Sequence, residues 1–189
     1  IMTRFLDLYP DVSGRLLFLD RVTNLVDEGI DVAVRIGHLP DSSHAAIRVG
    51  QVRRVICGAP ALFEAQGAPR EPADLARYRI IAATSAWTSL DWHFGTTERT
   101  TVQVRPSLYC NSNAGAIAAA RDGWGLTRLL SYQIAPDLAA GTLQTVLDDF
   151  EEAPLPVHIV HPEGRNASAK VRAFVDFAVS ALRSNRLLN

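Results

Sequence analysis

The sequence predicts an α/β protein of two lobes joined by two extended crossings. Strand-like and helix-like apolar segments alternate along most of the 189 residues, which is βαβ order and favours a parallel sheet. Two extended stretches, near 55–57 and 156–160, interrupt this order. We therefore expect one lobe from residues 1–56 plus 157–189 and a second from residues 57–156, as in hinged proteins that bind a ligand in a cleft.

Composition and charge exclude several classes of protein. Hydrophobic residues make up 48% and charged residues 21% of the chain, an ordinary composition for a soluble protein. A net charge of −1 argues against an extended nucleic-acid surface, because phosphate binding requires clustered Lys and Arg. No apolar run approaches the ~20 residues of a membrane span. We expect a cytoplasmic protein without membrane contact, in which Cys57 and Cys110 are reduced thiols rather than a disulfide.

The first lobe is expected to begin with a helix over residues 1–9, where the apolar spacing is helical and Pro10 follows. Residues 15–19 (RLLFL) predict a strand, and residues 22–26 a short helix before Gly29. Residues 30–36 alternate in character and predict a strand whose buried face carries Ile30, Val32, Val34 and Ile36, opposite Ala33 and Arg35.

The remaining elements follow from the same patterns. Residues 47–58 are extended and long for one strand. In the second lobe the sequence predicts helices at 60–66, 114–122 and 131–140 and strands at 79–84, 90–94, 101–109, 125–130 and 143–147. Pro106 indicates a sheet edge or a bulge, because proline lacks an N–H group. Gly141 is expected to end its helix. A return strand at 157–160 and a capped amphipathic helix from Ser168 to about Arg183 close the chain.

Polar side chains gather where these strands end. In open α/β sheets the carboxyl ends of the strands are where ligands bind. We hypothesise that the cleft is lined by residues that lie where a strand gives way to a loop or helix: Arg35, Gly37 and His38 from the first lobe, Ser85, Ala86, Trp87, Asn111, Ser112 and Asn113 from the second, and His161 at the return crossing.

Each candidate contact has a structural alternative. Arg35 could hold an anionic group in a bidentate pair or form a salt bridge with Asp20 or Asp31. Ser112 and Asn113 must cap their helix, and the free N–H groups there could in addition bind a carboxylate. Trp87 could form a wall of the pocket or anchor its loop.

Patterns for metal binding and catalysis are absent from the sequence. The five histidines lack metal spacing, since His158 and His161 would face opposite sides of one strand. There is no G-x-S-x-G elbow, no P-loop and no G-x-G-x-x-G. We expect no metal, no cofactor and no enzymatic activity; a small two-lobed hydrolase or dehydratase would require a nucleophile paired with a base.

Six segments follow one another in a characteristic order. They are FLDLYPDV at 5–12, EGIDVAVRIGHLPDSS at 28–43, ICGAPALFEAQGAPREPADL at 56–75, DGWG at 122–125, LAAGTLQTVL at 138–147 and KVRAFVDF at 170–177. This ordered set resembles the effector-binding domain of LysR-type transcriptional regulators over essentially the whole chain. The resemblance is to the branch with the pattern D-x-A-x-R-x-G-x-L-x-D-S-S, carried here by Asp31, Ala33, Arg35, Gly37, Leu39, Asp41, Ser42 and Ser43.

The resemblance implies a periplasmic-binding-protein type II-like fold, with two Rossmann-like subdomains and a small anionic or aromatic effector in the cleft between them. It also implies homodimers or tetramers, a strand ahead of the FLDLYP helix, and a winged helix-turn-helix absent from this chain through which alone the regulator contacts DNA. The expected function is allosteric effector sensing. The alternative is a periplasmic-type solute-binding protein for a small organic ligand.

Overall fold

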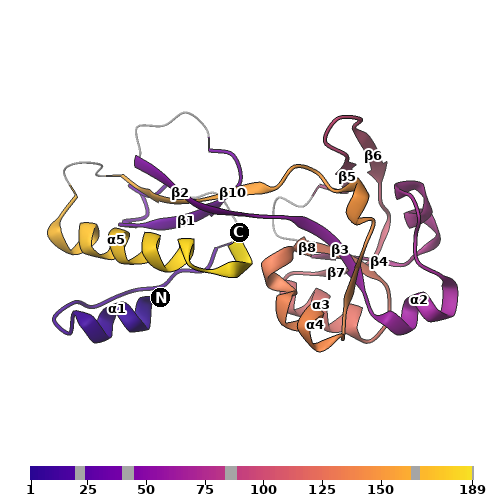
Figure 1. Cartoon of the computed structure of the whole chain (residues 1–189), viewed down its shortest axis with the longest axis horizontal. Coiled ribbons are helices and arrows are strands. Elements are labelled where there is room, and N and C mark those ends of the chain that lie inside the picture. Colours follow the sequence, from indigo (N-terminus) through magenta and orange to yellow (C-terminus); the bar gives the residue numbers. More distant parts are fainter. Residues whose placement is uncertain (20–23, 40–44, 84–88, 163–166, 189) are drawn as a thin grey trace. The chain divides into compact units, whose positions relative to one another are not determined.

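The computed structural model describes residues 1–19, 24–39, 45–83, 89–162 and 167–188. The chain forms two compact units: unit 1 comprises Ile1–Val52 and Leu155–Asn189, and unit 2 comprises Arg53–Pro154. The chain therefore leaves unit 1 once and returns to it once. Figure 1 labels the elements that build each unit.

Unit 1 is built on an antiparallel sheet in the order β1-β10-β2. The strands are β1 (Ala33–Ile36), β2 (Ala45–Val52) and β10 (Leu155–His161). The return strand β10 lies in the centre and is the most deeply buried, with Val157, Ile159 and Val160 at most 1% exposed. The prediction of a parallel sheet in this lobe is wrong for the described strands. β10 returns from unit 2 and is antiparallel to both of its neighbours, β1 and β2.

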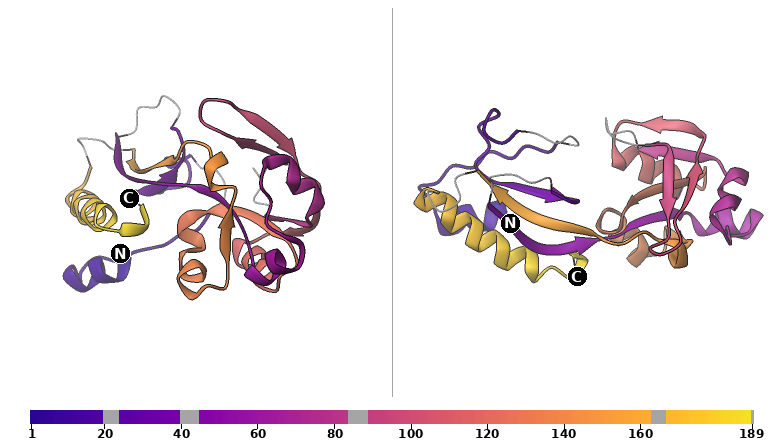
Figure 2. Two further views of the ribbon diagram at one scale, coloured as in Figure 1. Left: turned by 45° about the vertical axis from the view of Figure 1, so that its right-hand side comes forward. Right: turned by 90° about the horizontal axis from the view of Figure 1, so that it is seen from above.

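Two helices pack together in unit 1. The helix α5 (Ala169–Arg183) lies along the sheet (Figure 1). Of its predicted apolar stripe, Val171, Val175, Ala178 and Leu182 are buried and Phe174 is half-buried. The helix α1 (Met2–Leu8) lies beside α5 in each view of Figure 2. The ring centroid of Phe5 is 5.1 Å from that of Phe174, edge to face, and 5.7 Å from that of Phe177. This aromatic cluster joins the two ends of the sequence.

The part of unit 1 between α1 and β1 departs from prediction. Residues 15–19 have no regular secondary structure, so the strand expected there is wrong. No described strand pairs with this segment, and an extended segment without a partner leaves its backbone groups to water. Its large apolar side chains are accordingly exposed, Phe18 to 90%. The predicted helix at 22–26 lies partly outside the described residues, and residues 25–29 form a turn.

The strand β1 is shorter than predicted and its faces are reversed. Val34 and Ile36 are 55% and 36% exposed, whereas Ala33 and Arg35 are half-buried. The prediction assumed that the apolar face of an alternating strand is covered. In the described structure β1 is an edge strand that pairs only with β10, so the apolar face has little cover.

Unit 2 is built on a mixed sheet in the order β7-β4-β8-β3-β9. Its strands are β3 (Arg54–Gly58), β4 (Ile80–Ala83), β7 (Pro106–Cys110), β8 (Leu126–Leu130) and β9 (Gln144–Val146). Strand β4 is parallel to β7 and β8, and β3 is antiparallel to β8 and β9. A separate hairpin is formed by β5 (Asp91–Phe94) and β6 (Thr100–Gln103).

The helices of unit 2 are α2 (Pro60–Gln66), α3 (Asn113–Arg121) and α4 (Ala135–Ala140), with 3₁₀ turns at Pro72–Arg77, Ser131–Gln133 and Asp148–Phe150. The helix α3 packs on β4 and β8. Two apolar clusters form the core, one around Phe63, Trp92 and Leu126 and the other around Cys57 and Ile134.

Three predicted elements are divided in the structure. The segment 47–58 becomes β2 and β3, which belong to different units. The segment 101–109 becomes β6 and β7, which belong to different sheets. The helix expected at 131–140 becomes a 3₁₀ turn and α4. The expectation for Pro106 is confirmed, because β7 is an edge strand and its pairing with β4 shifts register there.

A buried carboxylate holds α3 to α4. Asp137 Oδ1 accepts hydrogen bonds from Arg121 Nε and, at 2.9 Å, from Thr142 Oγ1. The Arg121 guanidinium lowers the pKa of Asp137, so the carboxylate stays charged despite its burial. Burial, with a smaller contribution from the negative charge of Asp137, raises the pKa of Cys57 to about 12. Cys57 is therefore a thiol packed in the core and not a nucleophile.

The central position of β10 leads to a prediction about stability. Ile159 is completely buried, so Ile159→Ala should reduce the free energy of unfolding by about 2–5 kcal/mol. Ile36→Ala removes the same atoms from the partly exposed edge strand and should cost less than about 1 kcal/mol. Urea unfolding of both variants would measure the difference, and equal losses would contradict the central role of β10.

Candidate functional site

The carboxyl end of β1 carries the first three predicted site residues. Arg35 is half-buried, and His38 is exposed two residues after the strand. Gly37 has φ +118°, a conformation that favours glycine, and its N–H donates to the Pro156 carbonyl at 2.9 Å. Strand β1 is thereby fixed to the beginning of β10, with Arg35 directly opposite His158.

His158 is a further candidate residue that the sequence did not single out. It lies on the central strand between Arg35 of β1 and Arg48 of β2, and its Nδ1 is buried without a hydrogen-bond partner among the described residues. Burial, followed by the positive charges of Arg48 and His38, lowers its pKa below the usual value. The alternating pattern of VHIV places His158 on one face of its strand. The residues beside it, Arg35 and Arg48, are known only from the register in which the strands pair.

The amino end of α3 carries the next predicted residues. Ser112 is the N-cap, and its Oγ accepts from the Gly115 N–H at 3.2 Å, as the capping prediction required. Asn111 and Ser112 are exposed and Asn113 is half-buried. The N–H groups of the first turn therefore lie at an accessible surface of unit 2.

The other predicted residues are placed differently. Ser85, Ala86 and Trp87 lie outside the described residues. His161 is 7% exposed, and its Nδ1 has no hydrogen-bond partner in the described part of the chain. Because β10 runs against β1, His161 lies beyond Ala33, at the opposite end of the sheet from Gly37. The structure therefore brings Arg35, Gly37 and His38 together but separates His161 from them.

A cluster of charged residues lies where the chain enters and leaves unit 2. Arg128 is largely buried and donates to Glu152 Oε2 at 2.5 Å and to the His93 carbonyl at 3.0 Å. Its guanidinium also lies over the rings of Trp92 and Phe94, 5.7 and 5.6 Å from their centroids. Two further ion pairs join the ends of unit 2: Arg53–Glu151 at 2.8 Å and Arg54–Glu152 at 3.1 Å.

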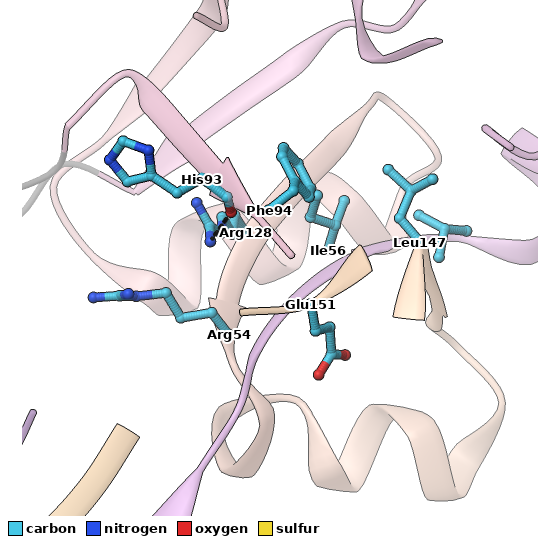
Figure 3. A pocket seen from close by; sticks show the side chains of 8 residues that line it. Arg54, Ile56, His93, Phe94, Arg128, Leu147 and Glu151 are labelled. Carbon is cyan, nitrogen blue, oxygen red and sulfur yellow. Dashed lines mark hydrogen bonds between the residues drawn. The ribbon is translucent and has the colours of Figure 1, made fainter. Parts of the chain in front are cut away.

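Figure 3 shows the small cavity beside this cluster, with Arg54, His93, Arg128 and Glu151 among its lining residues. The cavity has room for about one water molecule. Burial raises the pKa of Glu151, an effect that Arg53 opposes. Both the size of the cavity and the internal pairing of its charges indicate a structural role for the cluster.

The cluster leads to a prediction with a matched control. Glu152→Gln should reduce the free energy of unfolding by about 1–3 kcal/mol, because it leaves the buried Arg128 without its carboxylate. Glu151→Gln makes the same chemical change opposite Arg53, which is 47% exposed, and should cost less than about 1 kcal/mol. Denaturant unfolding of the two variants measures this contrast, and the reverse order would show that Arg128 does not depend on Glu152.

The lowered pKa of His158 predicts a dependence of stability on pH. The unfolded chain takes up a proton at this residue near pH 6.5, whereas the folded chain resists it, so stability should fall as the pH drops below about 6.5. His158→Gln should remove that part of the loss. His93→Gln, at an exposed position in unit 2, serves as the control and should keep the wild-type profile. Unfolding free energies at pH 7.5 and 5.5 test this, and identical profiles for all three proteins would refute it.

The described ranges contain no candidate metal site and no candidate membrane-spanning helix. No group of three or more His, Cys, Asp or Glu side chains gathers there in a way that could hold a metal ion. Among the helices of these ranges, none combines the length and apolar character that crossing a bilayer requires.

Comparison with known proteins identifies the family to which this chain is similar. Residues 1–183 match the family described as LysR substrate binding domain. The chain is 29% identical to an HTH-type transcriptional repressor of Pseudomonas aeruginosa (strain UCBPP-PA14), over 94% of this chain and 57% of the relative. It is 30% identical to the HTH-type transcriptional regulator PtxR of P. aeruginosa (strain PAO1), over 93% of this chain and 57% of the relative. The chain thus spans little more than half the length of these relatives.

Solved structures show the same fold. The full-length virulence activator AphB of Vibrio cholerae, a member of the LTTR protein family, matches with a TM-score of 0.83 and 22% identity, over 95% of this chain and 62% of that one. The regulatory domain of CrgA from Neisseria meningitidis matches with a TM-score of 0.80 and 21% identity, over 96% and 89%. The predicted fold class, α/β of the periplasmic-binding-protein type II kind, is confirmed.

Proposed function

Because this chain belongs to the LysR substrate binding domain family, we propose that it is the effector-sensing part of a longer DNA-binding transcriptional regulator. The family match over residues 1–183 carries the proposal. The curated relatives are HTH-type regulators of which this chain covers 57%. In the intact protein a helix-turn-helix outside this chain contacts the operator, and this near-neutral chain does not.

The regulator acts by changing the populations of two conformations. A small anionic or aromatic metabolite binds one arrangement of the regulator more tightly than the other and so shifts the balance between them. Couplings of this kind are typically about 1–3 kcal/mol. Catalysis has no part in this mechanism, and the regulator works in the cytoplasm as a homodimer or tetramer.

The predicted contact residues support such a site to different degrees. Arg35 lies near the end of β1 and His38 follows it, Gly37 ties this strand to β10, and Ser112 caps the exposed amino end of α3. A carboxylate is the group that both an arginine fork and the amino end of a helix favour. His161, at the far end of β10, is separated from Arg35 and is left out of the proposed contact set.

Substitution of the two main contacts tests the proposal. A carboxylated effector is first found by a thermal-shift screen of small carboxylates against the chain. Arg35→Ala and Ser112→Ala should then each weaken its binding about tenfold, measured by calorimetry, since each removes a hydrogen bond to a charged group. The melting temperature should stay within a few degrees, with Arg186→Ala and Ser180→Ala as controls. In the intact regulator the same effector should alter operator affinity.

Two results would contradict the proposal. A large loss of stability with unchanged affinity would mean that Arg35 and Ser112 are structural residues. Tight and specific binding of operator DNA by the isolated chain would place the DNA-binding activity in this part of the protein.

A further inference from the structure

Three strands of unit 1 bring three basic side chains into one row. His158 on the central strand β10 is directly opposite Arg35 on β1 and directly opposite Arg48 on β2. Residues opposite each other in an antiparallel pair share a face of the sheet, with Cβ atoms about 4.5–5.5 Å apart. The three side chains therefore cross one face of the sheet as neighbours.

A β-bulge in β2 creates the second half of this row. Val157 pairs with Gly50, and a regular ladder would then place Val49 opposite His158. The register shift between Val157 and His158 skips Val49 and brings Arg48 to that position instead. Bulges commonly re-aim a side chain at a functional position, and Val49 itself is buried. The bulge thus replaces an apolar neighbour of His158 with a cation.

The row combines an exposed side chain with two half-buried ones. Arg48 is exposed, and its Nη2 donates to the neutral Gln51 side chain at 2.9 Å. Arg35 and His158 are half-buried, and His158 Nδ1 has no hydrogen-bond partner among the described residues. His38, one residue beyond Gly37, adds positive potential close enough to affect His158. A ligand can reach the row from solvent at the exposed Arg48.

We infer that Arg35, His158 and Arg48 form a binding site for an oxyanion, the carboxylate or phosphate group of the effector. The row presents two guanidinium groups on either side of one imidazole on the same face of the sheet, and an anion placed over it would be attracted by both positive charges. Two guanidinium groups flanking an imidazole offer planar N–H pairs on both sides of the anion. The inference rests on the proposed function and adds to it the ligand class and two residues, His158 and Arg48.

Inorganic phosphate and citrate serve as the probes, titrated into the chain at constant ionic strength against chloride. Both should bind saturably, shift the His158 Cε1–H resonance in NMR spectra and raise the melting temperature. Arg48→Gln and His158→Gln should each weaken binding about tenfold, the usual effect of losing a hydrogen bond to a charged group. Arg48→Lys retains the charge without the fork and should recover part of the affinity.

A matched control removes a charge elsewhere in unit 1. Lys170→Gln, at the exposed beginning of α5, should bind both probes with wild-type affinity. Circular dichroism identifies any variant that has lost its fold, and the exposed Arg48 keeps the test open if His158→Gln unfolds. The inference is overturned if the wild type binds neither probe saturably, or if Arg48→Gln binds both within twofold of the wild type.

The effector-sensing function and the oxyanion site can be refuted independently of each other. If a screened effector loses affinity in Arg35→Ala but binds Arg48→Gln and His158→Gln as it binds the wild type, the oxyanion site is overturned and the effector function stands. If the probes bind the row as described but no effector changes the operator affinity of the intact regulator, the sensing function fails and the oxyanion site stands.

Discussion

The return of the chain into unit 1 as the central strand β10 is the constraint on which this unit depends. β10 pairs with β1 on one side and β2 on the other, although more than a hundred residues separate those strands from it in the sequence. Closing so long a loop costs conformational entropy, which the burial of Val157, Ile159 and Val160 offsets. The same pairing places His158 between two arginines, so the fold and the proposed site depend on one strand.

A cluster of ion pairs joins the first and last residues of unit 2. The first residues, Arg53 and Arg54, and the last, Glu151 and Glu152, are joined by ion pairs, and the buried Arg128 binds Glu152 from β8. These contacts hold together the two points at which the chain passes to unit 1. Exposed pairs alone would contribute little. The Arg128 side chain is largely buried and lies over the rings of Trp92 and Phe94, so its pair with Glu152 is better shielded from solvent than an exposed pair.

Features decided by neighbouring residues were predictable from the sequence, and features decided by distant pairing were not. Ser112 caps α3, Pro106 lies on an edge strand, and α5 buries its predicted stripe, because capping, backbone donors and helical periodicity act over a few residues. Residues 15–19 have the composition of a strand, but a strand requires a partner that no local pattern supplies. The buried face of β1 was assigned wrongly for the same reason.

The same distinction applies to the residues of the candidate site: local patterns indicate some of them, and only the pairing of distant strands indicates the others. Arg35 and Ser112 could be proposed from the sequence because each stands near a recognisable end of an element, whereas Arg48 and His158 lie in the middle of strands. Their placement opposite each other depends on the bulge at Val49, and nothing in IRVGQV shows where the register shifts. Burial, followed by the positive charges of Arg48 and His38, lowers the pKa of His158 and so favours its neutral form. An anion bound in the proposed site would reverse that preference, so ligand binding and protonation of His158 would reinforce each other.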